Sequence, residues 1–392
     1  MRDAHRFATL AVHAGESPCP ATGALDTPIY QSNTFVSADA DEMAAVYGGE
    51  KPGYMYTRYG NPTIRALETK VAALEGGGAA LAFATGMAAI SSAILGYVKA
   101  ADHVVAQRSL YGGAYNFLNT KLPRMGASTT FVPSSRVEDF EKAVQPNTRL
   151  IYFETPSNPV LEIVDIAALA RLANARGIPT IIDNTFASPA LQRPIPLGVT
   201  VSVHSATKYL CGHGDAMGGV VIGPQDYISR LAHDVIRDFG GVISPFNAWL
   251  ILRGIRTLHL RMPAHCANAV QVAEFLARHP RIERVHYPGL ASHPGHEIAR
   301  KQMSAFGAML SFDLRDGYEG GKKVMDRVKI FARAGSLGDT RSLIVHSAST
   351  SHRAVPRDQR LAIGITDGLV RLSVGIEAVE DLIADLDQAL AF

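Results

Sequence analysis

The side chain best placed for covalent chemistry is Lys208, which interrupts an apolar part of the chain. It follows the hydroxyl residues Ser205 and Thr207 and lies between the apolar runs 201–204 and 219–222. These runs predict two buried strands, a poor place for a solvated charge. A lysine amine removed from water is a weaker base and a better nucleophile toward an aldehyde. From this residue alone, a solvated lysine that caps a strand end is the commoner alternative.

An acidic residue lies upstream, at a position where parallel sheets bind ligands. Residues 179–182 are mostly β-branched and apolar, and Asp183 follows them, 25 residues before Lys208. Open α/β sheets bind ligands at the carboxyl ends of their strands. Such an acid can keep a pyridine nitrogen protonated, while the lysine holds pyridoxal 5'-phosphate (PLP) as a Schiff base. Ser205 and Thr207 then offer hydroxyls to the phosphate of the same cofactor.

The block Val203-His-Ser-Ala-Thr-Lys-Tyr-Leu resembles the signature of the PLP-dependent enzymes of Cys/Met metabolism, the transsulfuration group. This group includes methionine γ-lyase, cystathionine γ-lyase, cystathionine γ-synthase and the O-acylhomoserine sulfhydrylases, and the resemblance covers nearly the whole chain. It implies PLP as cofactor and PLP fold type I, the fold of aspartate aminotransferase. It also implies that Lys208 and Asp183 are catalytic and that Thr185 belongs to the same cofactor site.

Composition excludes several other classes of protein. The 392 residues carry a net charge of +2, and 47% are hydrophobic, which is enough for two domains with full cores. No charge block indicates nucleic-acid binding, and no apolar run is long enough to span a membrane. The three cysteines, at 19, 211 and 266, predict neither disulfides nor a metal site. We therefore expect a cytoplasmic protein without metal, nucleic-acid or membrane partners.

Residues 1–60 are expected to form an extended arm, because prolines and glycines interrupt short apolar pieces that show no long helical period. Such an arm buries little of itself and is expected to lie on another subunit. Near its end lie Tyr56 and Arg58, whose phenol and guanidinium suit a phosphate. From these residues alone, a surface turn is an equal alternative. The resemblance implies that both side chains cross a dimer interface to the neighbouring subunit's PLP, and that two such dimers form a homotetramer.

Further candidate residues follow strands within 61–245, the expected PLP-binding domain. Gly86 and Met87 open a helix of small residues, where free amides can hold a phosphate; a plain strand-to-helix turn is the alternative. Tyr111 follows another strand, where its ring can stack on a cofactor and its hydroxyl can move a proton, or where it can simply pack. The resemblance places Tyr111 on the PLP ring and Asn158 beside the phenolic oxygen and the substrate.

Short strands alternate with helices from residue 79 to 222, which predicts a doubly wound, mostly parallel sheet. A boundary is expected near residue 245. We expect 246–392 to form a smaller C-terminal α/β domain that opens with helices at 247–260 and 263–278.

The C-terminal region supplies a candidate anchor for a substrate carboxylate. Arg371 lies inside an apolar strand, where an arginine is costly unless it meets an anion. A structural salt bridge is the alternative. The resemblance favours a substrate carboxylate as the anion and adds Ser336 as a second contact.

The resemblance, together with these residues, implies a PLP enzyme that acts at Cγ of an L-homoserine-type amino acid. We expect γ-elimination that gives 2-oxobutanoate and ammonia, as in methionine γ-lyase. The alternatives are γ-replacement, as in O-acetyl- or O-succinylhomoserine sulfhydrylase or cystathionine γ-synthase, and a γ-lyase for an oxygen-linked substrate such as canavanine. Gly113, Arg237 and Gly335 depart from patterns of the known lyases and leave this choice open. A non-catalytic scaffold is disfavoured because every expected PLP ligand is present, and a dehydrogenase because no Gly-x-Gly-x-x-Gly follows an early strand.

Overall fold

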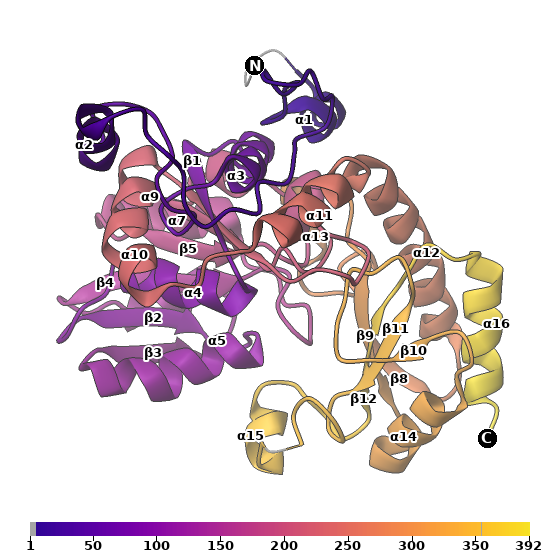
Figure 1. Ribbon diagram of the computed structural model, residues 1–392. Helices are drawn as coiled ribbons and strands as arrows, with labels where there is room; N and C mark the ends of the chain where they lie inside the picture. The colour runs from indigo at the N-terminus through magenta and orange to yellow at the C-terminus, as the bar shows by residue number, and fades with distance from the viewer. Residues whose placement is uncertain (1–4, 354) are drawn as a thin grey trace.

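The computed structural model describes residues 5–353 and 355–392, and its backbone is organised around two β-sheets (Figure 1). A seven-stranded sheet and its helices make up one side of the molecule, and a five-stranded sheet with its helices makes up the other. The N-terminal segment, coloured indigo, lies along one edge of the molecule. Within the described residues, no helix has the length and apolarity needed to cross a membrane.

The seven-stranded sheet is mostly parallel, in the order β1-β7-β6-β5-β4-β2-β3. Only β7 opposes its neighbours β1 and β6, and all the other neighbouring pairs are parallel. The predicted fold class is therefore confirmed, and the sheet also contains β3, for which the sequence analysis made no prediction. The strands are β1 (Ala79–Phe83), β2 (His103–Gln107), β3 (Ser128–Val132), β4 (Thr148–Glu154), β5 (Thr180–Asp183), β6 (Val201–His204) and β7 (Gly219–Gly223).

Both faces of this sheet are covered by helices, so its central strands are continuous hydrophobic runs. In β4, Leu150 and Tyr152 pack into the cluster around α4, while Ile151 and Phe153 pack into the cluster around α7. The helices and short helical turns of this region are α4 (Gly86–Leu95), α5 (Gly112–Asn116), η1 (Phe117–Lys121), η2 (Leu122–Met125), α6 (Val137–Ala143), α7 (Ile166–Ala175), α8 (Ser188–Leu191), η3 (Ile195–Leu197), α9 (Gln225–Leu231), η4 (Ala232–Ile236) and α10 (Arg237–Phe239).

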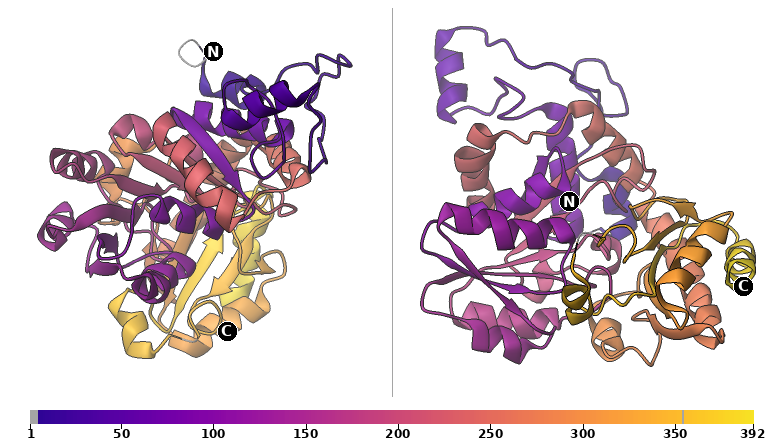
Figure 2. Two further views of the ribbon diagram at one scale, coloured as in Figure 1. Left: turned by 60° about the vertical axis from the view of Figure 1, so that its left-hand side comes forward. Right: turned by 90° about the horizontal axis from the view of Figure 1, so that it is seen from below.

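The N-terminal segment contains helices α1 (Phe7–His13) and α2 (Ala40–Gly48), which were not predicted from its sequence because prolines and glycines interrupt it. Helix α1 packs on α3 (Pro62–Glu75), where the buried Lys70 Nζ donates to the carbonyl of Ala11 and pairs with Glu16 at 2.6 Å. The start of the expected arm is thus held on its own chain. Farther along, α2 projects from the body in the right-hand view of Figure 2.

The five-stranded sheet has the order β10-β11-β12-β9-β8. Its strands are β8 (Ile282–His286), β9 (Met309–Leu314), β10 (Ala332–Arg333), β11 (Leu343–His346) and β12 (Leu369–Ser373). The helices around it are α11 (Pro245–Ile255), α12 (Leu258–Arg278), α13 (His296–Gln302), α14 (Gly317–Arg327), α15 (Arg357–Ala362) and α16 (Val379–Leu390).

The helix boundaries expected at 247–260 and 263–278 were wrong at their junction. The first helix ends at Ile255 and the next begins at Leu258, so Pro263 lies inside α12 rather than at its start. Proline favours the first turn of a helix but does not require it. Burial of residues such as Leu258 and Met262 in the main core holds this earlier turn in the helix.

Candidate active site

A cavity of about 380 Å³ lies between the strand ends of the seven-stranded sheet and the C-terminal sheet. Eleven of the thirteen residues singled out from the sequence line it, although they come from segments far apart in the chain. They are Gly86, Met87, Tyr111, Asn158, Asp183, Thr185, Ser205, Thr207, Lys208, Ser336 and Arg371.

One end of the cavity is an anion cradle at the start of α4. Thr85 caps this helix, and its Oγ1 accepts a hydrogen bond of 3.0 Å from the Ala88 amide. The first amides of a helix have no acceptor within it and point outward, where they attract an anion. A Cβ on Gly86 would lie only 2.8 Å from the Cβ and Oγ of Ser205. Glycine is therefore required for the helix start and the Ser205 turn to approach each other.

The hydroxyl of Thr207 is engaged with the backbone. It donates to the Gly218 carbonyl and accepts from the Gly218 amide, both at 3.1 Å. These two bonds fix the turn that carries Lys208. A hydrogen bond from Thr207 to a phosphate would require its hydroxyl to rotate away from the Gly218 carbonyl, because an ionised phosphate only accepts and this hydroxyl has one proton.

Lys208 extends from this turn to the middle of the cavity. Its Nζ donates to Ser336 Oγ at 2.8 Å, a contact that joins the two halves of the molecule. Partial burial lowers the pKa of Lys208, and the positive charge of Arg371 lowers it further. The amine is therefore more readily neutral, and hence nucleophilic, than a solvated lysine.

The acid Asp183 ends β5 and is 8% exposed. Its Oδ1 accepts hydrogen bonds from the Thr185 amide at 2.9 Å and the Thr185 hydroxyl at 2.5 Å. Burial raises the pKa of Asp183, whereas the Thr185 hydrogen bonds and the charge of His204 oppose that rise. The same Thr185 Oγ1 accepts a hydrogen bond from the Ser205 amide at 2.8 Å. One hydroxyl therefore connects Asp183 to the turn at Ser205, which borders the anion cradle.

The opposite end of the cavity is a cationic site. Arg371 Nη1 donates to Asn158 Oδ1 at 2.8 Å, and its Nη2 donates to the Ser336 carbonyl at 3.2 Å. No carboxylate of the described residues forms an ion pair with Arg371. Removal from water lowers the pKa of this guanidinium to about 10, still well above neutrality. The alternative of a structural salt bridge therefore has no partner in the described chain.

Comparison with known proteins agrees with this geometry. Residues 8–391 match the family model described as Cys/Met metabolism PLP-dependent enzyme. The chain belongs to this family. It is 48% identical to L-methionine gamma-lyase of Fusobacterium nucleatum, with 97% of each chain covered. It is 43% identical to O-succinylhomoserine sulfhydrylase of Pseudomonas aeruginosa over 98% of this chain and 95% of the relative. The crystal structure of metB from Corynebacterium glutamicum superposes with a TM-score of 0.94 at 42% identity, covering 100% and 99% of the two chains.

As a Cys/Met-metabolism enzyme the protein uses PLP, and the donors in its cavity fit that cofactor. The cradle between Gly86 and Ser205 matches the phosphate, and Asp183 matches the ring nitrogen. Lys208 supplies an amine of lowered pKa in the same cavity, which suits the aldehyde. The phosphate, the ring nitrogen and the aldehyde of PLP thus each have a complementary group in the cavity.

The sequence analysis missed one acidic residue that lines the cavity, Glu154. It ends β4, pairs in register with Asp183 on β5, and is 4% exposed. Both of its carboxylate oxygens accept the Tyr111 amide at 2.9 Å, which places Tyr111 at the cavity rim. Burial raises the pKa of Glu154 well above its usual range, and the nearby Asp183 adds to the rise. Its position at a strand end, like that of Asp183, was the signal that could have found it.

Two of the thirteen residues, Tyr56 and Arg58, lie outside this enzyme's own cavity. Arg58 lies against two tyrosine rings, with its guanidinium carbon 5.3 Å from the centre of Tyr56 and 5.2 Å from that of Tyr59. Arg237 covers Tyr59 from 4.9 Å. Tyr56 is 38% exposed, so this aromatic and cationic cluster faces outward from its own chain.

Proposed function

We propose that this enzyme catalyses γ-elimination on an L-homoserine-type amino acid, releasing the γ-substituent, 2-oxobutanoate and ammonia. The observation that carries the proposal is the convergence of an amine and a carboxylate anchor. Lys208 Nζ lies 2.8 Å from Ser336 Oγ, and the Ser336 carbonyl is bound by Arg371. The 48% identity to a methionine gamma-lyase over nearly the full length supports elimination as the reaction.

Substrate orientation is assigned to Arg371 and Ser336. A guanidinium presents parallel N–H groups to a carboxylate, which fixes both its position and its orientation. Asn158 holds one side of the guanidinium through the 2.8 Å hydrogen bond. An amino acid bound this way directs its Cα hydrogen toward Lys208.

Proton transfer is assigned to Lys208, Asp183 and Tyr111. PLP, when bound, supplies the electron sink that stabilises negative charge next to the amino group. Lys208 Nζ removes the proton from Cα, and Asp183 would keep the ring nitrogen protonated, the state in which the ring can act as this sink. After a further deprotonation at Cβ, the electron pair of that C–H bond forms the Cβ–Cγ double bond, and the bond from Cγ to the leaving group breaks. The leaving group takes the electron pair of the broken bond and a proton from the Tyr111 hydroxyl, and water then hydrolyses the carbon–nitrogen bond, which supplies the oxygen of 2-oxobutanoate and releases ammonia.

A second candidate reaction is γ-replacement by sulfide on an O-acylhomoserine. The 43% identity to an O-succinylhomoserine sulfhydrylase favours it, and the same cavity residues would serve up to the loss of the leaving group. Gly113 is also relevant, because a Cβ there would lie 2.6 Å from the Tyr111 ring and 2.7 Å from Met87 Sδ. The Tyr111 ring therefore lies in a space that a side chain at position 113 would occupy.

We also propose a homo-oligomer, a tetramer built from two dimers, in which Tyr56 and Arg58 complete the cavity of a neighbouring subunit. Their outward position supports this arrangement, as does the exposure of Leu25 (81%) and Val36 (98%) in the same segment. A segment this apolar is expected to be covered in the assembled protein. The cytoplasmic location stays a prediction.

A substrate panel on PLP-loaded enzyme tests the proposed reaction. L-Methionine, L-cystathionine, O-acetyl- and O-succinylhomoserine and L-canavanine are each supplied with and without sulfide, and 2-oxobutanoate and amino-acid products are measured separately. Oxoacid formed without sulfide is the expected result and identifies the leaving group. Amino-acid product that requires sulfide would replace elimination by γ-replacement.

A further inference from the structure

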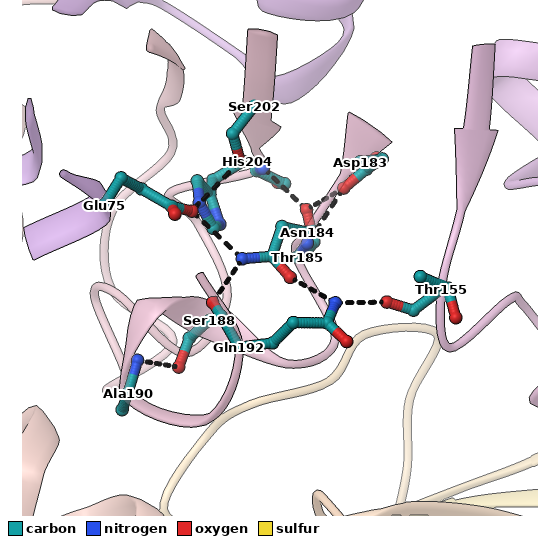
Figure 3. A network of polar contacts seen from close by, with 11 residues as sticks. Glu75, Thr155, Asp183, Asn184, Thr185, Ser188, Ala190, Gln192, Ser202 and His204 are labelled. Atoms are coloured by element: carbon teal, nitrogen blue, oxygen red, sulfur yellow. Dashed lines mark hydrogen bonds and ion pairs between the residues drawn. The ribbon is translucent and has the colours of Figure 1, made fainter. Parts of the chain in front are cut away.

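A buried polar network lies directly behind the acid Asp183 (Figure 3). Its centre is Glu75, the last residue of α3, which is fully buried. Glu75 Oε1 accepts hydrogen bonds from Ser202 Oγ at 3.0 Å and Asn184 Nδ2 at 2.9 Å, and it forms a short contact with His204 Nε2. One carboxylate oxygen therefore joins helix α3 to the ends of β5 and β6.

The network holds the turn after Asp183 on the side away from the cavity, through contacts of Asn184. Asn184, the next residue, also donates to the Gln192 carbonyl and accepts from Gln192 Nε2, both at 2.9 Å. Gln192 Nε2 in turn donates to the Thr155 carbonyl at 2.8 Å, just after the strand end that bears Glu154. Figure 3 shows this continuous path from Glu75 through Asn184 and Gln192 to Thr155. The two acids of the cavity are thus anchored through one set of contacts.

Stability alone is a weak reason for a buried carboxylate here. Buried ion pairs are often replaceable by apolar residues without loss of stability. The ion pair between Glu75 and His204 also leaves Glu75 Oε2 and His204 Nδ1 without hydrogen-bond partners among the described residues. The charge of His204 helps to lower the pKa of Asp183 against the effect of burial. The pair therefore acts on the acid that faces the cofactor.

We propose that Glu75 is a positioning residue for the cofactor ring: through Asn184 and His204 it holds Asp183 in place and ionised, so that the PLP nitrogen keeps its proton. This proposal rests on the proposed function only in assigning Asp183 to the ring nitrogen. Glu75 itself does not line the cavity.

The test uses Glu75→Gln, with Ser202→Ala as matched control, because the Ser202 hydroxyl donates to the same Glu75 oxygen but has no hydrogen bond to Asp183 or Asn184 in the described chain. Each holoenzyme is loaded with nitrogen-15-labelled PLP, and NMR reports the protonation of the ring nitrogen at one fixed pH. The affinity for PLP, kcat, KM and thermal stability are measured in parallel. We expect Glu75→Gln to move the ring signal toward the unprotonated value and to lower kcat about 10- to 100-fold with little change in KM. Ser202→Ala should match the wild type.

A wild-type ring signal and kcat in Glu75→Gln, even with a lower melting temperature, would make Glu75 purely structural and overturn the proposal. If Glu75→Gln fails to fold or load, His204→Gln decides by the same measurements: a displaced signal supports the proposal and an unchanged one overturns it. Asp183→Asn separates the two assignments. An unchanged ring signal in that variant would show that Asp183 is not the ring acid, a failure of the proposed function rather than of the network alone.

Discussion

Replacing Arg371 by alanine should destroy the carboxylate anchor while leaving the cofactor end of the cavity intact. The guanidinium is fixed by Asn158 and the Ser336 carbonyl, and no carboxylate of the described chain neutralises it. A hydrogen bond to a charged group contributes roughly 1.5 to 3 kcal/mol. Two such bonds to a substrate carboxylate, allowing for non-additivity, correspond to about 4 kcal/mol, or about a 1,000-fold loss of kcat/KM, since each decade is about 1.4 kcal/mol.

The assay is steady-state formation of 2-oxobutanoate from the best substrate of the panel. Most of the loss should appear in KM, because the carboxylate is bound throughout the reaction. Arg371→Lys keeps the charge but not the fork and should lose less activity than alanine. The affinity for PLP should not change. Wild-type enzyme should also prefer the free acid strongly over the amino-acid amide, and Arg371→Ala should lose that preference. A loss below about tenfold in PLP-loaded Arg371→Ala, with the acid preference retained, would refute the anchor.

Four further substitutions test other parts of the structure. Lys208→Ala should abolish turnover yet still bind PLP noncovalently, and substantial remaining γ-chemistry would remove this lysine as the base. Arg58→Ala should weaken PLP retention through the neighbouring subunit, measured by dialysis and absorbance, whereas unchanged retention would argue against a shared site. Gly113→Ala should displace the ring beside it and alter the ratio of elimination to replacement, with stability as control; an unchanged ratio would contradict that role. Glu16→Gln should leave the buried Lys70 without its anion and destabilise the fold by about 3 kcal/mol in urea unfolding, and a change below about 1 kcal/mol would show that the lysine finds other partners.

Much of the fold was predictable because its signals are local. Helix α3 (Pro62–Glu75) is capped at its start by Asn61, whose side chain accepts a hydrogen bond from the Thr63 amide. It is capped at its end by Gly76, which has the left-handed conformation. Both signals depend on a few neighbouring residues. Strand β3 and helices α1 and α2 were not predicted, because each is too short to show a long hydrophobic period, and α2 has no buried residue.

The sequence by itself determined which groups are available for chemistry. Lys208 after Ser-x-Thr and Asp183 at the end of a β-branched run are recognisable because each lies next to the element that carries it. Only the tertiary structure decided which polar groups meet. The contact of Arg371 with Asn158 spans 213 residues, and Glu75 meets His204 across 129. These pairings depend on which strands are neighbours in the sheets, and strand order is set by the packing of the whole core rather than by any local pattern.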